Sequence, residues 1–175
     1  MGVIKYSDQR VGVLIDVQNL YHSAKHLYQS RVNFKELLEV AVAGRKLVRA
    51  FGYVVKSEVS TDEASFFEAL EKSGFELKVK DLQIFPGGMK KADWDVGLAI
   101  DAVRIAPALD SVIIASGDGD FVPLVEYLQN TGKQVEVIAF AKSSSAKLRE
   151  AVDEFVDIGE QPEKFLLPIR RKNKK

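Results

Sequence analysis

Four aspartates stand where short apolar runs give way to turns or helices, and they are the residues best suited to chemistry. Asp118 and Asp120 follow one such run in the sequence SGDGD, and Asp16 ends an earlier run. Asp95 stands near the start of a helical pattern, after a loop that contains Pro-Gly-Gly. Carboxylate oxygens without Cys or His partners are typical ligands of hard cations. We therefore predict that these four acids hold Mg²⁺ or Mn²⁺.

The elements around these acids predict how they are brought together. The runs VGVLI (11–15) and SVIIA (111–115) indicate strands buried on both faces of a sheet. Strands alternate with helices along the chain, which favours an α/β fold: a three-layer α/β/α sandwich with a mainly parallel central sheet. Ligands of such sheets bind beyond the carboxyl ends of the strands, and we expect all four acids at that edge.

Electrostatics explains why a cluster of carboxylates points to a metal ion. Two unit charges 4 Å apart repel by about 4 kcal/mol at an effective dielectric constant near 20. A helix N-terminus offsets only roughly 0.3–1 kcal/mol of this. A divalent cation removes the repulsion, and it also activates water and neutralises charge on a phosphate. The cluster therefore predicts hydrolysis of a phosphate ester.

Each acid also has a purely structural interpretation, which stays open at this point. Asp16 suits a turn or the cap of the following helix. Asp118 and Asp120 suit a turn that the two glycines make tight, with Asp120 as the cap of the next helix. Asp93 and Asp95 favour the first turn of a helix.

Three polar residues accompany the acids as supporting candidates. Asn19 is either a helix cap or a ligand, and Ser116 either shapes its turn or contacts the site. Asp101 is expected at the edge of the site rather than as a ligand, because it stands three residues before Arg104 and suits an intrahelical ion pair. The pair His22 and His26 has a zinc-compatible spacing but lacks an acidic partner motif, so we favour no zinc site.

Nucleic-acid binding needs a local basic patch, because the formal net charge is zero. Solvated surface is the alternative for each basic residue, and the core is the alternative for the tryptophan. The basic candidates, which we expect at or near the same edge as the acids, are Lys90, Lys91, Arg104, Lys142, Lys147 and Arg149, and Trp94 is a candidate for stacking on a base.

Composition limits the remaining classes. The 175 residues suit one domain, which we place at 1–160, followed by a mobile basic tail at 161–175. The absence of cysteine excludes disulfides, cysteine zinc sites and thiol nucleophiles. No signal peptide or membrane span is evident, so we expect a cytoplasmic protein that does not bind membranes. The pattern at 92–106 is apolar on nearly every side and predicts a buried helix.

Three stretches together resemble a known family. These are LIDVQNLY, KADWDVGLAID and IIASGDGDFVPLVEYLQNTGKQVEVIAF, within residues 9–158. They resemble the NYN domain of the PIN-like nuclease superfamily, in its bacterial LabA-like branch. The resemblance implies a PIN-like sandwich that cleaves RNA with a divalent metal. The family's acids then correspond to Asp16, Asp95, Asp118 and Asp120, with Asn19 and Ser116 as neighbours and Asp101 as a further acid.

Two positions depart from the family pattern. Val17 replaces the usual glycine, and Trp94 replaces an apolar residue of another kind. Our first hypothesis is a metal-dependent ribonuclease acting on single-stranded RNA, with a homodimer as a further expectation. A non-catalytic RNA-binding or regulatory module is the alternative. A haloacid-dehalogenase-like phosphatase is disfavoured, because its nucleophile needs a second aspartate two residues on, where this chain has Gln18.

Overall fold

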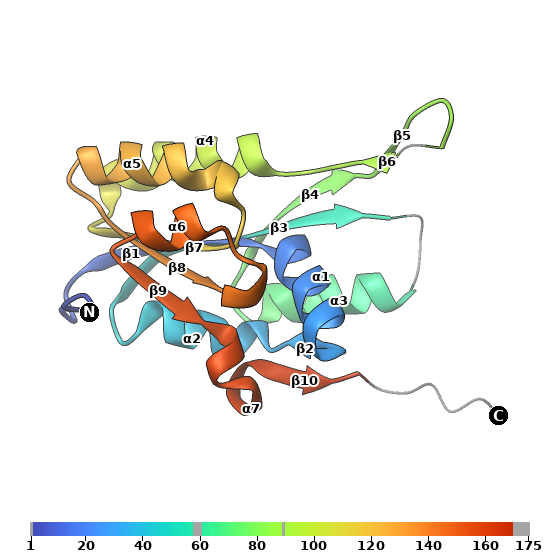
Figure 1. The fold of residues 1–175 in the computed structure, drawn as a ribbon, viewed down its shortest axis with the longest axis horizontal. Coiled ribbons are helices and arrows are strands. Elements are labelled where there is room, and N and C mark those ends of the chain that lie inside the picture. The colour runs from blue at the N-terminus through green and yellow to red at the C-terminus, as the bar shows by residue number, and fades with distance from the viewer. Residues whose placement is uncertain (1, 58–60, 89, 170–175) are drawn as a thin grey trace.

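A six-stranded parallel sheet forms the centre of the molecule (Figure 1). The computed structural model describes residues 2–57, 61–88 and 90–169. The strand order is β4-β3-β1-β7-β8-β9, and all five pairings are parallel. The strands are β1 (Arg10–Asp16), β3 (Lys46–Lys56), β4 (Glu76–Asp81), β7 (Ser111–Ala115), β8 (Gln134–Ala139) and β9 (Glu154–Asp157).

Helices cover both faces of the sheet, which confirms the predicted three-layer α/β fold. In Figure 1, α4 and α5 lie above the sheet, whereas α2 and α3 lie below it. The described helices are α1 (Val17–Tyr28), α2 (Phe34–Val42), α3 (Thr61–Lys72), α4 (Asp95–Ile105), α5 (Val122–Asn130), α6 (Ala146–Ala151) and α7 (Pro162–Phe165). The short pairs β2 (Ser30–Val32) with β10 (Leu166–Pro168), and β5 (Gln83–Ile84) with β6 (Lys90–Lys91), stand outside the main sheet.

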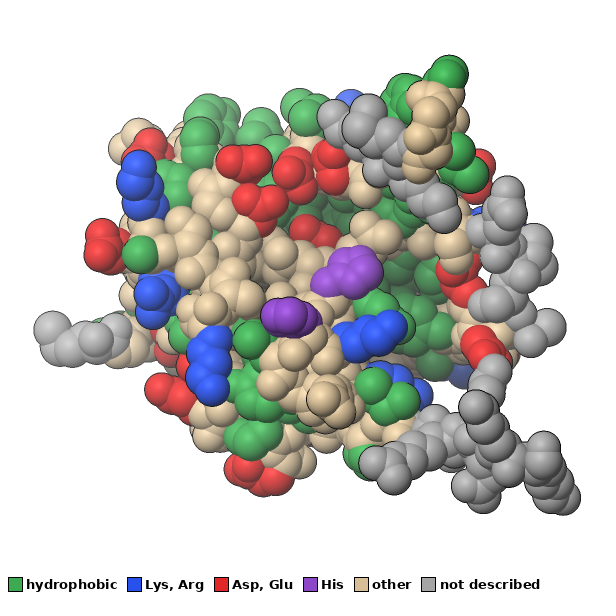
Figure 2. Space-filling view, turned by 45° about the vertical axis from the view of Figure 1, so that its right-hand side comes forward, with side chains coloured by type: hydrophobic (Ala, Val, Ile, Leu, Met, Phe, Trp, Pro, Cys, Tyr) green, Lys and Arg blue, Asp and Glu red, His purple; other side chains and the backbone are tan. Residues whose placement is uncertain are grey.

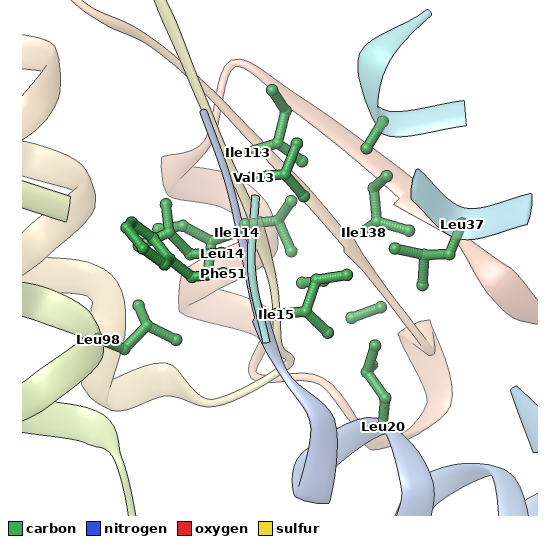
Figure 3. Packing of buried hydrophobic residues seen from close by; sticks show 14 of the residues in the cluster. Val13, Leu14, Ile15, Leu20, Leu37, Phe51, Leu98, Ile113, Ile114 and Ile138 are labelled. Atoms are coloured by element: carbon green, nitrogen blue, oxygen red, sulfur yellow. The ribbon is translucent and has the colours of Figure 1, made fainter. Parts of the chain in front are cut away.

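The core lies on both sides of β1 and β7, whose inner residues are fully buried. Figure 3 shows that alternate side chains of β1 point to opposite layers. Leu14 points toward Leu98 of α4, whereas Ile15 points toward Leu20 and Leu37 of the other layer. This alternation explains the continuous apolar runs in the sequence, because a strand that is covered on both faces needs apolar residues at every position.

The connection of the strands determines where a ligand can bind. From β1 the chain proceeds to β3 and β4 on one side, and it then returns to β7 on the other side of β1. The direction of the strand order therefore reverses between β1 and β7. Crevices at such reversals, beyond the carboxyl ends of the strands, are the usual ligand sites of open α/β sheets.

The predicted burial of residues 92–106 is wrong for one face of α4. Val96 is 74% exposed and Ile100 is 47% exposed, while Leu98 and Ala102 are fully buried. The apolar composition predicted burial on all sides, but only the face toward the sheet is covered within the described residues. The exposed face of α4 lies beside α5 and lines a groove with it.

The prediction of a mobile tail from residue 161 onward is wrong for its first part. Residues 162–168 form α7 and β10, and β10 pairs antiparallel with β2. Phe165 is 2% exposed and belongs to the core, and its carbonyl accepts a hydrogen bond from Asn33 N–H at 2.7 Å. The burial of this one aromatic ring and the pairing with β2 explain why residues 162–168 have a defined structure. The rest of the expected tail, 170–175, lies outside the described residues.

Membrane insertion through a helix finds no support in the structure. Every helix in the described ranges is too short or too polar to span a bilayer.

Candidate metal centre

The loop after β7 positions two of the four predicted acids. Asp118 caps the short 3₁₀ helix Gly119–Phe121, because its Oδ1 accepts a hydrogen bond from Asp120 N–H at 2.9 Å. The predicted cap of the following helix by Asp120 is wrong, because α5 has Phe121 at its N-cap and no side-chain cap hydrogen bond. The side chain of Asp120 makes no cap and is exposed. In this turn the Asp118 side chain accepts a backbone hydrogen bond, whereas the Asp120 side chain is exposed to solvent.

The two glycines of this loop are required for close packing rather than for a special backbone conformation. Neither Gly117 nor Gly119 is among the glycines with positive φ. A Cβ atom on Gly117 would meet the Oγ of Ser144, and it would lie 3.0 Å from the Cα of that residue. A Cβ on Gly119 would lie 2.7 Å from Ser145 Oγ. The loop before α6 therefore packs directly against the acidic turn and holds it in place.

Asp16 lies at the junction of β1 and α1 and is tied to the neighbouring loop. Its Oδ1 accepts a hydrogen bond from Asn19 N–H at 3.2 Å, which caps α1. Its Oδ2 accepts a hydrogen bond from Ser116 Oγ at 3.4 Å. Asn19 Oδ1 in turn accepts from Gly117 N–H at 3.1 Å. The predicted supporting residues Asn19 and Ser116 therefore connect the first motif with the third.

Asp95 is the first residue of α4, and Trp94 anchors that helix to the sheet. The Trp94 indole N–H donates to the Val54 carbonyl at 2.9 Å, and its ring packs on Tyr53 with centroids 5.4 Å apart. Gly97 makes room for this ring, because a Cβ there would lie 2.5 Å from Trp94 Cε3. Trp94 is thus a packing residue that fixes where Asp95 begins its helix.

Three of the predicted acids come together in space although they are distant in the sequence. Oxygens of Asp95, Asp118 and Asp120 all lie within 4.8 Å of one another. Among the described residues, this is the one group of His and acidic side chains whose geometry suits a metal ion, and it contains neither His22 nor His26. Asp16 lies next to the group but is not part of it.

Within the described part of the chain, no positive side chain compensates the charges in this cluster. Burial and then the negative charges of Asp118, Asp93, Asp16 and Asp120 raise the pKa of Asp95 to about 6. Burial also raises the pKa of Asp16 above its usual value, with smaller contributions from Asp118 and Asp93. No ion pair of the described residues involves any of these acids. A set of hard oxygens that lacks a cation fits a divalent metal ion.

Asp101 occupies a different position from these acids. It stands six residues after Asp95, which is about 9 Å along the helix axis. It accepts a hydrogen bond from Tyr53 OH at 2.9 Å, and Arg104 lies 3.7 Å away. The predicted intrahelical pair with Arg104 is confirmed, and Asp101 acts as a support between α4 and β3.

The predicted nucleic-acid contacts are scattered. Arg104 lies in the last turn of α4, about 14 Å along the axis from Asp95, so its expected place at the acidic edge is wrong. Trp94 has the Lys80 ammonium 4.4 Å from its ring centroid, in addition to its contacts with the sheet. The side chains of Lys90 and Lys91 lie outside the described part of the structure. Lys142, Lys147 and Arg149 are exposed around α6.

The two departures from the family pattern leave the acids accessible. Val17 is 4% exposed and packs in the core, so its branched side chain does not cover the carboxylates. The Trp94 ring is bound to the sheet by its hydrogen bond to the Val54 carbonyl. Neither residue removes or blocks an acid of the cluster.

Comparison with known proteins identifies the fold and the family. The family model of the NYN domain matches residues 10–159. A crystal structure of a protein of unknown function, VPA0982 from Vibrio parahaemolyticus, superposes with a TM-score of 0.84 at 34% identity, over 94% of this chain and 100% of that one.

Two curated relatives are more distant in sequence. The low amplitude and bright protein LabA of Synechococcus elongatus is 26% identical over 69% of this chain and 73% of its own length. The uncharacterized protein MJ0482 of Methanocaldococcus jannaschii is 25% identical over 95% of this chain, which spans 63% of that relative's length. With a family model that matches nearly the whole described fold, the chain belongs to the NYN domain family.

Proposed function

We propose that the protein is a metal-dependent ribonuclease that hydrolyses phosphodiester bonds of single-stranded RNA. One observation carries the proposal: oxygens of Asp95, Asp118 and Asp120 converge within 4.8 Å, and no cationic side chain of the described residues pairs with them. They do so where the strand order reverses, at the carboxyl edge of the sheet. Membership of the NYN domain family supports a nuclease-like activity.

The chemistry divides between an ion and the chain. Asp95, Asp118 and Asp120 would hold Mg²⁺ or Mn²⁺, and Asp16 supplies a fourth carboxylate beside them. When bound, the ion activates water and neutralises charge that develops on a phosphodiester.

Asp16 is suited to proton transfer in this scheme. Hydrogen bonds from Asn19 and Ser116 fix its carboxylate beside the other acids. Burial raises its pKa, so it accepts a proton more readily than an ordinary aspartate. We assign to Asp16 Oδ2 the uptake of the proton that the attacking water loses.

The experiment compares single-residue variants for cleavage of a labelled single-stranded RNA in Mn²⁺ or Mg²⁺. Asp118→Asn should lower the rate at least 100-fold, because the ion loses a charged ligand. The amide oxygen can still accept the hydrogen bond from Asp120 N–H, so the fold should persist in circular dichroism. Asp110→Asn is the matched control, since Asp110 pairs with Arg10 at the opposite end of the sheet. Equal activity of Asp118→Asn and wild type would reject the assignment.

The same assay distinguishes the ribonuclease from the alternative function, a non-catalytic RNA-binding or regulatory module. RNA binding that persists in EDTA, with no cleavage in any divalent metal, would favour it over the ribonuclease. Titration with Mn²⁺ in a calorimeter adds an independent measurement, because the ribonuclease proposal requires wild-type protein to bind the ion and Asp118→Asn to bind it weakly.

The expected homodimer stays a prediction. The exposed apolar side chains of Val96, Ile100 and Tyr127 on α4 and α5 are the surface to examine, by light scattering of wild type and Ile100→Glu.

A further inference from the structure

A second hollow lies beside the acidic cluster and has a different character. It is a groove with a volume of about 680 Å³. Its walls are α1, α3 and the end of β3, and its remaining side is formed by β2 and the start of α2. In Figure 2, green apolar surface lies to the right of the histidine side chains, Lys and Arg side chains lie below them, and acidic side chains gather above and to the left. The volume is within the range of small-ligand sites.

The groove lies near the candidate metal centre through two of its lining residues, although none of the four acids lines it. Val17 lines it and is the residue after Asp16, and Val54 lines it and accepts on its carbonyl the hydrogen bond from Trp94. Whatever occupies the groove therefore lies near the acids. A nucleic-acid strand bound at the acids would extend into this groove, and we therefore consider such a strand as its occupant.

The floor of the groove offers aromatic surface. Phe66 and Phe67 line it, and both are half-buried. Phe66 is fixed by ring contacts with Phe34 at 5.9 Å and with Phe67 at 6.2 Å between centroids. Nucleobases of single strands stack on side chains of this kind.

The charges around the groove are unevenly distributed. Arg31 and Lys35 are exposed on the β2 and α2 side, together with the exposed imidazole of His22. Asp62 and Glu63 of α3 stand on the opposite side. A phosphate that follows the base is therefore attracted to the first side and repelled by the second.

We propose that this groove is a subsite for one nucleotide of a single-stranded RNA, with the base between α1 and α3 and its neighbouring phosphate at Arg31 and Lys35. The proposal rests on the proposed ribonuclease function for its substrate class. It adds where the strand runs on one side of the acids and which side chains receive it.

The test measures binding of a fluorescein-labelled 12-nucleotide oligouridylate by anisotropy, in EDTA and with full-length protein. Ala69 is exposed on α3 and lines the groove, whereas Ala64 is exposed on the same helix and does not. Ala69→Trp fills the groove and should weaken binding about tenfold, the usual consequence of losing one base stack. Ala64→Trp should bind like wild type. Thermal melting of both variants verifies that they fold.

Two further readouts separate the base from the phosphate. Wild type should bind the oligouridylate more tightly than an abasic oligomer of equal length, and Ala69→Trp should lose this preference. The double variant Arg31→Gln/Lys35→Gln should reduce the slope of log K against log salt by about 1.4, because each lost phosphate contact on a single strand contributes about 0.7.

The outcomes distinguish this proposal from the ribonuclease itself. Equal affinity of Ala69→Trp and Ala64→Trp for RNA would overturn the subsite, whether or not the protein cleaves RNA, and would leave the groove to a peptide partner. Weaker binding by Ala69→Trp, in a protein that cleaves nothing in any metal, would support the subsite and reject the ribonuclease.

Discussion

Two groups of charged side chains lie at opposite ends of the central sheet, and they are built on opposite principles. At the amino ends of the strands, the carboxylate of Glu136 is 3% exposed and receives Arg45 Nη1 at 2.7 Å and Nη2 at 3.1 Å. Ser111 Oγ donates to the same carboxylate at 2.8 Å. At the carboxyl ends, the oxygens of three aspartates converge, and none of the described Lys or Arg side chains forms an ion pair with them.

The pKa values show the consequence of this difference. Burial opposes the ionisation of Glu136, but the hydrogen bonds from Arg45, Ser111 and Gln134 outweigh it and lower its pKa. Burial and neighbouring negative charges instead raise the pKa of Asp95 to about 6. A buried charge that serves the fold has its counter-charge in the same chain. Carboxylates whose repulsion no described side chain compensates are therefore suited to a ligand from outside the chain.

The largest effect is expected from breaking the compensated group. Glu136→Gln leaves the guanidinium of Arg45 buried without its counter-charge, which should cost about 3–5 kcal/mol of unfolding free energy. Urea unfolding followed by circular dichroism measures it. Asp110→Asn breaks the exposed pair with Arg10 and should leave stability nearly unchanged. A similarly small effect of Glu136→Gln would mean that the network is not essential to the fold.

A divalent cation should stabilise the folded protein by binding at the aspartate cluster, and not at the Glu136 group. Mn²⁺ at a hundred times its dissociation constant should raise the unfolding free energy by about 2.7 kcal/mol, because the ion binds the folded state alone. The same addition should stabilise Asp118→Asn much less, because that variant binds the ion weakly. Wild type that melts at one temperature with Mn²⁺ and with EDTA would contradict the proposed metal centre.

The packing that holds the acidic turn should matter somewhat less. Gly117→Ala forces a Cβ against Ser144 and should cost about 1–3 kcal/mol through overpacking. It should also weaken Mn²⁺ binding, because Asp118 follows directly. The double variant Gly117→Ala/Ser144→Gly removes the side chain that is in the way and should recover part of both losses. Unchanged binding in the single variant would show that the loop adapts.

The pH dependence of stability in EDTA should be the smallest effect, and its sign should differ between the two groups. The raised pKa of Asp95 means that the folded state binds its proton more tightly than the unfolded chain. The resulting stabilisation is present at low pH and is lost as the pH rises through about 6. Wild type should therefore gain stability relative to Asp95→Asn between pH 7 and pH 5.

The lowered pKa of Glu136 has the opposite consequence. Its contribution is present above the pKa of the unfolded chain and is lost as the pH falls below that value. Melting curves of wild type, Asp95→Asn and Glu136→Gln between pH 2.5 and pH 7 measure both signs. Parallel pH profiles of the three proteins would contradict the contrast.

The strands and the acids were largely predictable because their signals are local. Runs such as SVIIA need only their own composition to indicate a doubly covered strand, and the order of strands and helices then places Asp16, Asp118 and Asp95 at one edge. Less local features were mispredicted. The order of residues 162–168 depends on a pairing with β2, more than a hundred residues away.

The sequence by itself determined the α/β class, the acids that could hold a cation and the resemblance to the NYN domain. Only the tertiary structure decided that Asp95 joins Asp118 and Asp120 while Asp16 stands beside them, and that Gly117 makes room for Ser144. It also decided that a groove with aromatic floor lies near the acids. The physical reason is that residue type and spacing determine the local conformation of a segment and which of its faces is apolar. Distances between segments depend on how separate layers pack, and no local pattern encodes them.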